Sequence, residues 1–231
     1  MSEIWQGVIK AIALLLAWDP KVQEIVLLSL RVSGTALLFS ALLGIPIGTW
    51  LGLRRFVGRR LIIAMLYTGM GFPPVVVGLF VYLMLSRSGP FGFLGLLLTP
   101  TAMVIAQVTI SFPLVAGFTM AAVMAVDPSL RRQLISLGAT PRQATWSLLR
   151  EARLGVIVSV IAGFGSIISE VGAVMLVGGN IEGSTRVLTT AIVLETRKGA
   201  FDLAIALSII LLALSFLVNL AMLRLQGRAF E

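Results

Sequence analysis

The chain has 231 residues, of which 58% are hydrophobic and 12% charged, and its formal net charge is +8. A mean hydropathy of +1.03 indicates an integral membrane protein rather than a soluble domain. Cysteine and histidine are both absent, which excludes disulfides, thiolate metal sites and imidazole bases, so we expect neither a metal site nor a catalytic residue.

The first predicted element is a short amphipathic helix over residues 9–18. Lys10 interrupts this apolar stretch and Asp19-Pro20 ends it, so it is too short to cross a membrane. Trp5 and Trp18, near its two ends, are typical anchors at the interface between lipid and water. We expect this helix to lie on the membrane surface.

Five apolar runs then follow that are long enough to cross the hydrocarbon layer, which takes about 20 residues. They lie near residues 25–53, 61–85, 95–125, 155–177 and 203–223. These runs predict an all-α integral membrane protein with five transmembrane helices in a single transmembrane domain over residues 1–231. A basic segment, residues 127–153, separates the third run from the fourth.

Arginine is concentrated on one side of the predicted membrane. That side holds Arg54, Arg55, Arg59, Arg60, Arg131, Arg132, Arg142, Arg150, Arg153, Arg224 and Arg228, whereas acidic residues nearly balance the basic ones on the other side. Because cytoplasmic loops carry the excess of basic residues, we predict an external N-terminus and a cytoplasmic C-terminus. The basic residues stand at the feet of the spans rather than among exposed aromatic residues, so we expect no nucleic-acid partner.

The basic segment contains two helix-start signals. Asp127-Pro128 predicts a short helix over residues 129–137, Gly138 ends it, and Thr140-Pro141 begins a second helix that runs into the fourth span. One interpretation is a plain connector whose arginines only set the orientation. A length of about 25 residues, where loops commonly have fewer, favours a docking surface for a cytoplasmic protein.

The turn Leu137-Gly138-Ala139 between these helices resembles the coupling-helix segment of ABC importer permeases. In that family a Glu-Ala-Ala…Gly motif enters a groove on the ATPase subunit. Gly138 matches the glycine, whereas Arg132, Gln133 and Leu134 stand at the Glu-Ala-Ala positions. The resemblance implies that the ATPase-contacting residues are Arg131, Arg132, Leu137, Gly138, Ala139, Thr140 and Pro141.

The second run contains the sequence TGMGFPPVVVG at residues 68–78. Pro73 and Pro74 cannot donate backbone hydrogen bonds, so the helix should kink or break, about 18 Å from its cytoplasmic end. Broken helices at this depth commonly line a transport path. The break therefore serves either a path or packing alone, and the candidate path residues are Thr68, Gly69, Gly71, Pro73 and Pro74.

Glu170, next to Ser169, is the one acidic residue inside an apolar run, and both residues are candidates for the path or its gate. The second half of the broken helix near Pro73 would aim the positive end of its dipole at the break, which suits an anion, and a carboxylate would repel an anionic substrate. We therefore favour Glu170 as a structural or gating anchor, bonded to neighbouring backbone or paired with an arginine such as Arg186, over a role as a ligand.

Two longer stretches resemble the oxyanion branch of ABC permeases, which carries molybdate, sulfate and tungstate. They are TGMGFPPVVVGLFVYLMLSRSGPFG with TPTAMVIAQ, and ISEVGAVMLVGGNI. The likeness extends from about residue 25 to 223 and is greatest to tungstate-uptake permeases. It implies a type I importer permease of the MetI-like kind, with tungstate as the first substrate and molybdate or sulfate as alternatives. A self-contained channel or secondary transporter would leave the capped basic segment unexplained.

The resemblance also implies the partners. Two copies of the chain form a path in the inner membrane, in contact with lipid, and two ABC ATPase subunits dock from the cytoplasm. An extracytoplasmic binding protein meets the outer loop over residues 178–199. The lysines (Lys10, Lys21, Lys198) form no phosphate-binding-loop motif, so we expect no cofactor here and expect ATP and Mg on the ATPase.

Overall fold

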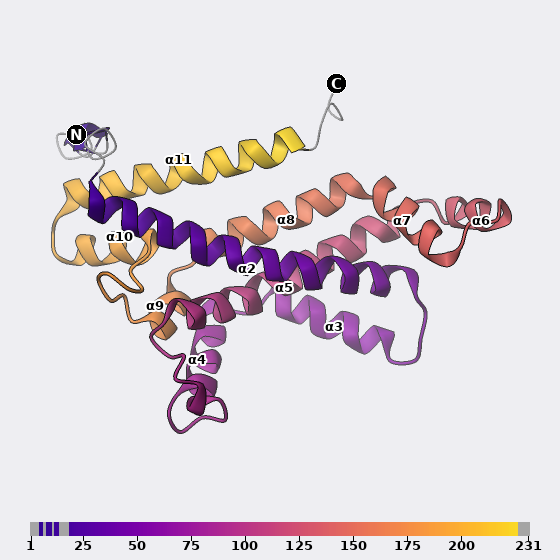
Figure 1. Cartoon of the computed structure of the whole chain (residues 1–231), viewed down its shortest axis with the longest axis horizontal. Coiled ribbons are helices and arrows are strands. Elements are labelled where there is room, and N and C mark those ends of the chain that lie inside the picture. Colours follow the sequence, from indigo (N-terminus) through magenta and orange to yellow (C-terminus); the bar gives the residue numbers. More distant parts are fainter. Residues whose placement is uncertain (1–4, 7, 11, 14–18, 226–231) are drawn as a thin grey trace.

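The computed structural model describes residues 5–6, 8–10, 12–13 and 19–225, and within these residues it contains helices and no strand, as predicted. The elements are α2 (Pro20–Leu53), α3 (Arg59–Met70), α4 (Pro74–Leu85), the 3-10 turn η1 (Gly92–Leu94), α5 (Pro100–Met124), α6 (Pro128–Ser136), α7 (Pro141–Glu151), α8 (Arg153–Ile168), α9 (Gly172–Gly178), α10 (Leu188–Arg197) and α11 (Phe201–Leu225) (Figure 1). The described residues from 5 to 13 are helical, whereas Trp18 and Arg228 lie outside the described residues.

The same local signal starts four of these helices. Asp19, Thr99, Asp127 and Thr140 each precede a proline, and each accepts a hydrogen bond from a backbone N–H of the first turn. Proline suits the first helical position because its missing N–H would have no partner there. This cap places the start of α2 at Pro20, five residues before the predicted range.

Three helices in the described part of the chain, α2, α5 and α11, are long and apolar enough to cross a membrane alone. Two bent pairs bring the number to five if each pair is one span: α3 with α4, bent by 103°, and α7 with α8, bent by 67°. The fourth predicted range, 155–177, is not one helix, because α8 ends at Ile168 and α9 begins at Gly172.

Helix α5 lies at the centre of the fold and contacts α2, α3, α4, α8 and α9 (Figure 1). Its contact with α2 depends on small residues: Gly44, Gly48 and Gly52 recur every four residues and face α5. A Cβ atom at Gly48 would collide with the carbonyl oxygen of Ala116. Small residues let two membrane helices approach closely, and a buried Ser40–Ser111 hydrogen bond of 2.7 Å adds to this contact.

Large apolar side chains also cover much of the outer surface. On α11, Leu212 is 71% exposed and Phe216 66% exposed, and the faces of α3 and α4 carry further exposed apolar residues. The largest buried cluster lies where α2, α4, α5 and α9 meet. An apolar exterior around a packed core is expected where the surrounding medium is lipid.

Candidate functional site

The helix break predicted at Pro73-Pro74 is present between α3 and α4. Helix α3 ends at Met70, Pro73 is extended (φ −60°, ψ 123°), and α4 begins at Pro74. Thr68, Gly71 and Pro73 are exposed, whereas Gly69 and Pro74 are half-buried. An added Cβ at Gly69 would lie 3.0 Å from the ring of Pro113, so this end of α3 packs closely on α5.

A second break separates α8 from α9 at residues 169–171, and Glu170 lies within it rather than inside a continuous helix. The side chain is buried, and its Oε1 accepts a 2.8 Å hydrogen bond from the N–H of Ala173. The backbone carbonyl oxygen of Glu170 accepts a 2.9 Å hydrogen bond from the Thr189 hydroxyl. The bond to neighbouring backbone is therefore present, but the ion pair suggested with Arg186 is not, because Arg186 pairs with Glu182 instead.

The fold brings the two breaks together. Gly78 of α4 packs on Ala173 of α9, where an added Cβ would lie 2.5 Å from the Ala173 Cα. Gly172 of α9 likewise faces Val75 at a Cβ distance of 2.7 Å. Thus α4 and α9 lie against one another near their starts, and the second break contains exposed Ser169 and buried Glu170.

A polar cavity of about 10 Å³ lies behind this break, which is room for one water molecule. Ser29, Ser33, Glu170 and Thr189 line it, together with Gln107 of α5. Gln107 donates 3.1 Å to the carbonyl of Ile167, and its buried Oε1 has no partner among the described residues. The sequence analysis did not single out Gln107, although an amide within the apolar run 95–125 was the available signal.

The basic segment forms a protruding helix–turn–helix at one end of the molecule (Figure 1). Gly138 has φ 87° and ends the first helix, with the N–H of Ala139 donating 2.9 Å to the carbonyl of Leu134. Thr140 forms a reciprocal capping box with Gln143 that begins α7. Leu137 is 85% exposed at the tip of the turn. The predicted helix starts and the helix end at Gly138 are thus present. However, α7 does not run straight into α8, because the chain bends by 67° at Ala152.

The predicted coupling residues differ in exposure. Arg132, Leu137, Gly138, Thr140 and Pro141 are exposed, whereas Arg131 and Ala139 are half-buried. Arg131 and Arg132, which are both predicted to contact the ATPase, line an open hollow next to the end of α5. Near the start of α6, a hydrogen bond from the N–H of Ser129 holds the pKa of the Asp127 carboxyl below its usual range.

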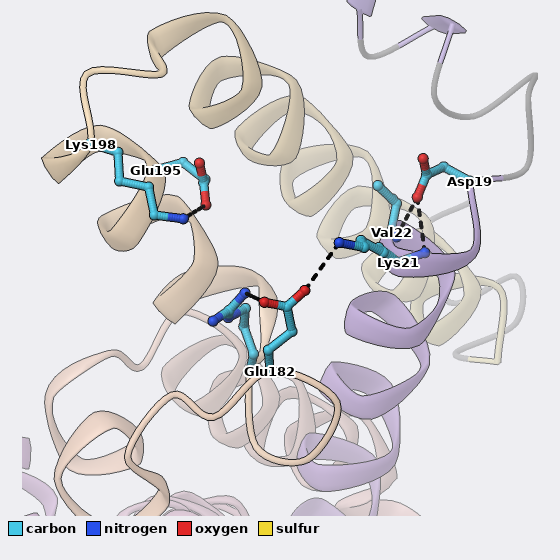
Figure 2. Close-up of polar contacts among 7 residues, drawn as sticks. Asp19, Lys21, Val22, Glu182, Glu195 and Lys198 are labelled. Atoms are coloured by element: carbon cyan, nitrogen blue, oxygen red, sulfur yellow. Dashed lines mark hydrogen bonds and ion pairs between the residues drawn. The ribbon is translucent and has the colours of Figure 1, made fainter.

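Ion pairs connect the elements at the opposite end. Glu182, in the loop between α9 and α10, accepts from Lys21 of α2 at 3.2 Å and from Arg186 at 3.1 Å, and Glu195 pairs with Lys198 at 2.8 Å (Figure 2). The Lys21 hydrogen bond is the main reason that the pKa of Glu182 is lowered. These side chains line a charged pocket of about 360 Å³ between α2, α10 and α11.

An apolar exterior, adjoining breaks in two membrane helices and a capped protrusion at one end define a multi-pass membrane permease subunit. Residues 44–230 match the family described as "Binding-protein-dependent transport system inner membrane component", and the chain belongs to this family. It is therefore an inner-membrane component of a transport system.

Two relatives resemble the chain over most of its length. The chain is 42% identical over 226 residues to the tungstate uptake system permease protein TupB of Peptoclostridium acidaminophilum, covering 98% of this chain and 99% of the relative. It is 44% identical over 210 residues to a probable anion ABC transporter permease protein of Haloferax volcanii, covering 89% and 90%. The predicted resemblance to the oxyanion branch of ABC permeases is confirmed.

A solved structure supports the fold. The chain has a TM-score of 0.72 with a bacterial ABC transporter involved in the import of the acidic polysaccharide alginate. The alignment covers 92% of this chain and 81% of the other, at 22% identity. The predicted fold of an ABC importer permease is therefore confirmed.

Proposed function

We propose that this chain is the transmembrane subunit of an ATP-driven importer for an oxyanion, with tungstate as its first substrate and molybdate or sulfate as alternatives. The observation that carries this proposal is 42% identity along 98% of the chain to a tungstate uptake permease. The chemistry of the helix breaks agrees with it. Neither helix break, residues 71–73 and 169–171, contains a lysine or arginine that would hold an anion tightly and delay its release.

The path is proposed to form between two copies of the chain. Thr68, Gly71, Pro73 and Ser169 lie exposed at the two breaks and would face it. Gly69 and Pro74 would shape the first break from behind, and buried Glu170 would anchor the second through its bond to Ala173. Backbone that leaves a helix at this depth is tolerated where it lines a water-filled cavity, as such a path would be.

Coupling to ATP is proposed to occur through α6 and the turn at Gly138. Two cytoplasmic ATPase subunits, which would hold ATP and Mg, would contact Leu137 and its neighbours, because this apolar side chain protrudes almost fully exposed. Capping hydrogen bonds at both helix starts would keep the two helices of the protrusion ordered. A movement of the ATPase would therefore reach α5 and α8 rather than being absorbed by a flexible loop.

At the opposite end, the proposal places the N-terminus outside the cell membrane and an extracytoplasmic binding protein on the outer loop. Lys21, Glu182 and Lys198 are exposed there around the charged pocket. Since such a surface offers both signs of charge, it can orient a partner through complementary charges. The binding protein would then select the oxyanion before it reaches the path.

Transport in vesicles tests the proposal. The chain is reconstituted with its ATPase and binding protein, and uptake of tungstate, molybdate and sulfate is measured with ATP, with a non-hydrolysable analogue, and without the binding protein. We expect uptake that needs both ATP and the binding protein and that is greatest for tungstate. ATP-independent uptake would contradict the importer, and equal uptake of sulfate would contradict the choice of tungstate.

A further inference from the structure

A hollow of about 530 Å³ lies at the end of the molecule that carries α6. Its wall combines segments that are far apart in sequence: Arg55 lies between α2 and α3, Arg59 begins α3, and Arg131 and Arg132 come from α6. Val123 and Met124, at the end of α5, form an apolar part of the lining. This arginine hollow is separate from the two helix breaks assigned to transport.

The arginine hollow has an excess of positive charge. Asp127 is the one carboxylate in its lining, and it accepts a 2.7 Å hydrogen bond from the N–H of Ser129 as the cap of α6. No ion pair joins any of the four arginines to a carboxylate in the part of the chain that the structure describes. Neighbouring like charges repel, so a bound anion would relieve an unfavourable arrangement.

One of the four guanidinium groups is held by a hydrogen bond, and a second has a buried donor without a partner. Arg59 Nε donates 2.8 Å to the carbonyl of Leu51, which fixes the start of its planar group. Arg131 Nε is shielded from solvent and has no partner among the described residues. A buried donor without an acceptor is costly, and a ligand oxygen would remove that cost.

The rule that places basic residues in the cytoplasm does not explain this convergence. That rule depends on the number of basic residues near the spans and not on their arrangement. Arg60 and Arg142 satisfy it while exposed and outside the arginine hollow. Arginine binds phosphate-like groups through paired, planar N–H donors, so several of them around one hollow indicate an anion site.

We propose that the arginine hollow binds a tetrahedral oxyanion group, carried either by a free anion in the cytoplasm or by the headgroup of an anionic phospholipid. Val123 and Met124 form an apolar part of the lining. This lining is compatible with the carbon atoms of a lipid headgroup ester and also with a free ion. This site goes beyond the proposed transport path, and its occupation does not depend on which oxyanion is transported.

The test uses the chain purified with its ATPase subunits and compares two double variants with the same change of charge. Arg55→Gln/Arg131→Gln alters the arginine hollow, and Arg60→Gln/Arg142→Gln alters two exposed arginines outside it. Calorimetric titration with sodium tungstate and with sodium phosphate, against sodium chloride of equal ionic strength, measures free anions. Native mass spectrometry after addition of phosphatidylglycerol measures retained lipid.

We expect at least one of these probes to bind saturably to the parent and to the control variant, Arg60→Gln/Arg142→Gln. Its affinity for the hollow variant, Arg55→Gln/Arg131→Gln, should be lower by about tenfold or more. The probe that binds identifies the source of the oxyanion group. The proposal is overturned if no probe binds saturably or if both double variants lose affinity equally. It is also overturned if the hollow variant sheds its ATPase subunits while no anion binds to the parent, because the arginines then form a protein-docking surface.

Discussion

Glu170 shows how a single residue holds the second helix break. Its buried carboxylate accepts the N–H of Ala173, one of the backbone donors at the start of α9 that would otherwise have no partner. Helix α8 ends at Ile168, two residues before Glu170, and α9 begins at Gly172, two residues after it. The structural role proposed for Glu170 therefore needs an acceptor oxygen at this place.

The first prediction separates that acceptor from the negative charge. Glu170→Ala should lower the free energy of unfolding by about 1–3 kcal/mol, because it leaves a buried N–H without a partner. Glu170→Gln keeps an oxygen at the same place and should stay close to the parent. Thermal unfolding in detergent measures both. If Glu170→Gln is as damaging as Glu170→Ala, the charge itself is required.

Gly138 is the residue whose conformation permits the turn between α6 and α7. Its φ is 87°, and an added Cβ would meet no atom within 4 Å, so only backbone strain opposes a larger residue. Gly58 offers a matched control, since its φ is 88° and its surroundings are equally open. Such strain costs about 1–2 kcal/mol in either place, so both variants should stay folded.

The second prediction concerns coupling. Gly138→Val should reduce the oxyanion taken up per ATP hydrolysed by several-fold, because the turn that faces the proposed ATPase is displaced. Gly58→Val should leave that ratio unchanged. Parallel assays of uptake and phosphate release in the same vesicles give the ratio. Equal coupling in the two variants would show that the turn at Gly138 does not transmit ATPase movement.

At the scale of elements, contact between α2 and α5 depends on glycines spaced by four residues. Gly48 is the most restricted of them, because its backbone lies directly against that of α5 at Ala116. Gly34 lies on the same helix, and an added Cβ there would meet no atom within 4 Å. The two positions have the same residue type and helical conformation but differ in their neighbours.

The third prediction uses this difference. Gly48→Leu should force α2 and α5 apart and destabilise the protein by about 1–3 kcal/mol or prevent its accumulation. Gly34→Leu should be tolerated. Melting temperature and the monodisperse fraction in size-exclusion chromatography measure both outcomes. Loss of folded protein in both variants would mean that Gly34 also faces a partner.

The fourth prediction concerns pH at the outer loop, where Glu182 joins α2 to the loop before α10. Lys21 and Arg186 lower the pKa of Glu182 from its ordinary value of 4.5. This ion pair therefore stabilises the fold above about pH 4.5, and the contribution is lost as the pH falls through the lowered pKa. The effect should be small because the carboxylate is exposed to solvent.

Replacing Glu182 by glutamine should weaken the acid dependence. The melting temperature of Glu182→Gln should fall less steeply than that of the parent when the pH is lowered from neutral to below 4.5. Glu151→Gln removes an exposed carboxylate that has no ion pair among the described residues and serves as control. Identical pH profiles for Glu182→Gln and the parent would contradict a stabilising role for the pair.

At the scale of the whole molecule, the arginine-rich connections gather at one end. Helices α2 and α11 run in the same general direction, and the α2–α3 connection lies toward the same end as α6 (Figure 1). The fifth prediction is that a fluorescent or enzymatic reporter fused after residue 231 lies in the cytoplasm. An external reporter would reverse the proposed positions of both the ATPase and the binding protein.

The sequence by itself determined those features that depend on neighbouring residues. Pairs such as Asp127-Pro128 and Thr140-Pro141 start helices, and Gly138 and Pro73-Pro74 end or break them, because backbone hydrogen bonding and φ are local properties. Apolar runs indicated the membrane class, because the length and composition of a run are also properties of neighbouring residues. The resemblance to ABC permeases also followed from contiguous stretches of sequence.

Only the tertiary structure decided how distant segments meet. The contact of α4 with α9, the hydrogen bond from Thr189 to the Glu170 carbonyl and the cavity at Gln107 all require chain folding. The convergence of Arg55 with Arg131 does so too. Within an apolar run, periodicity does not distinguish a lipid-facing side from a packed one, because both sides are apolar, so these pairings follow from close packing and buried polar contacts.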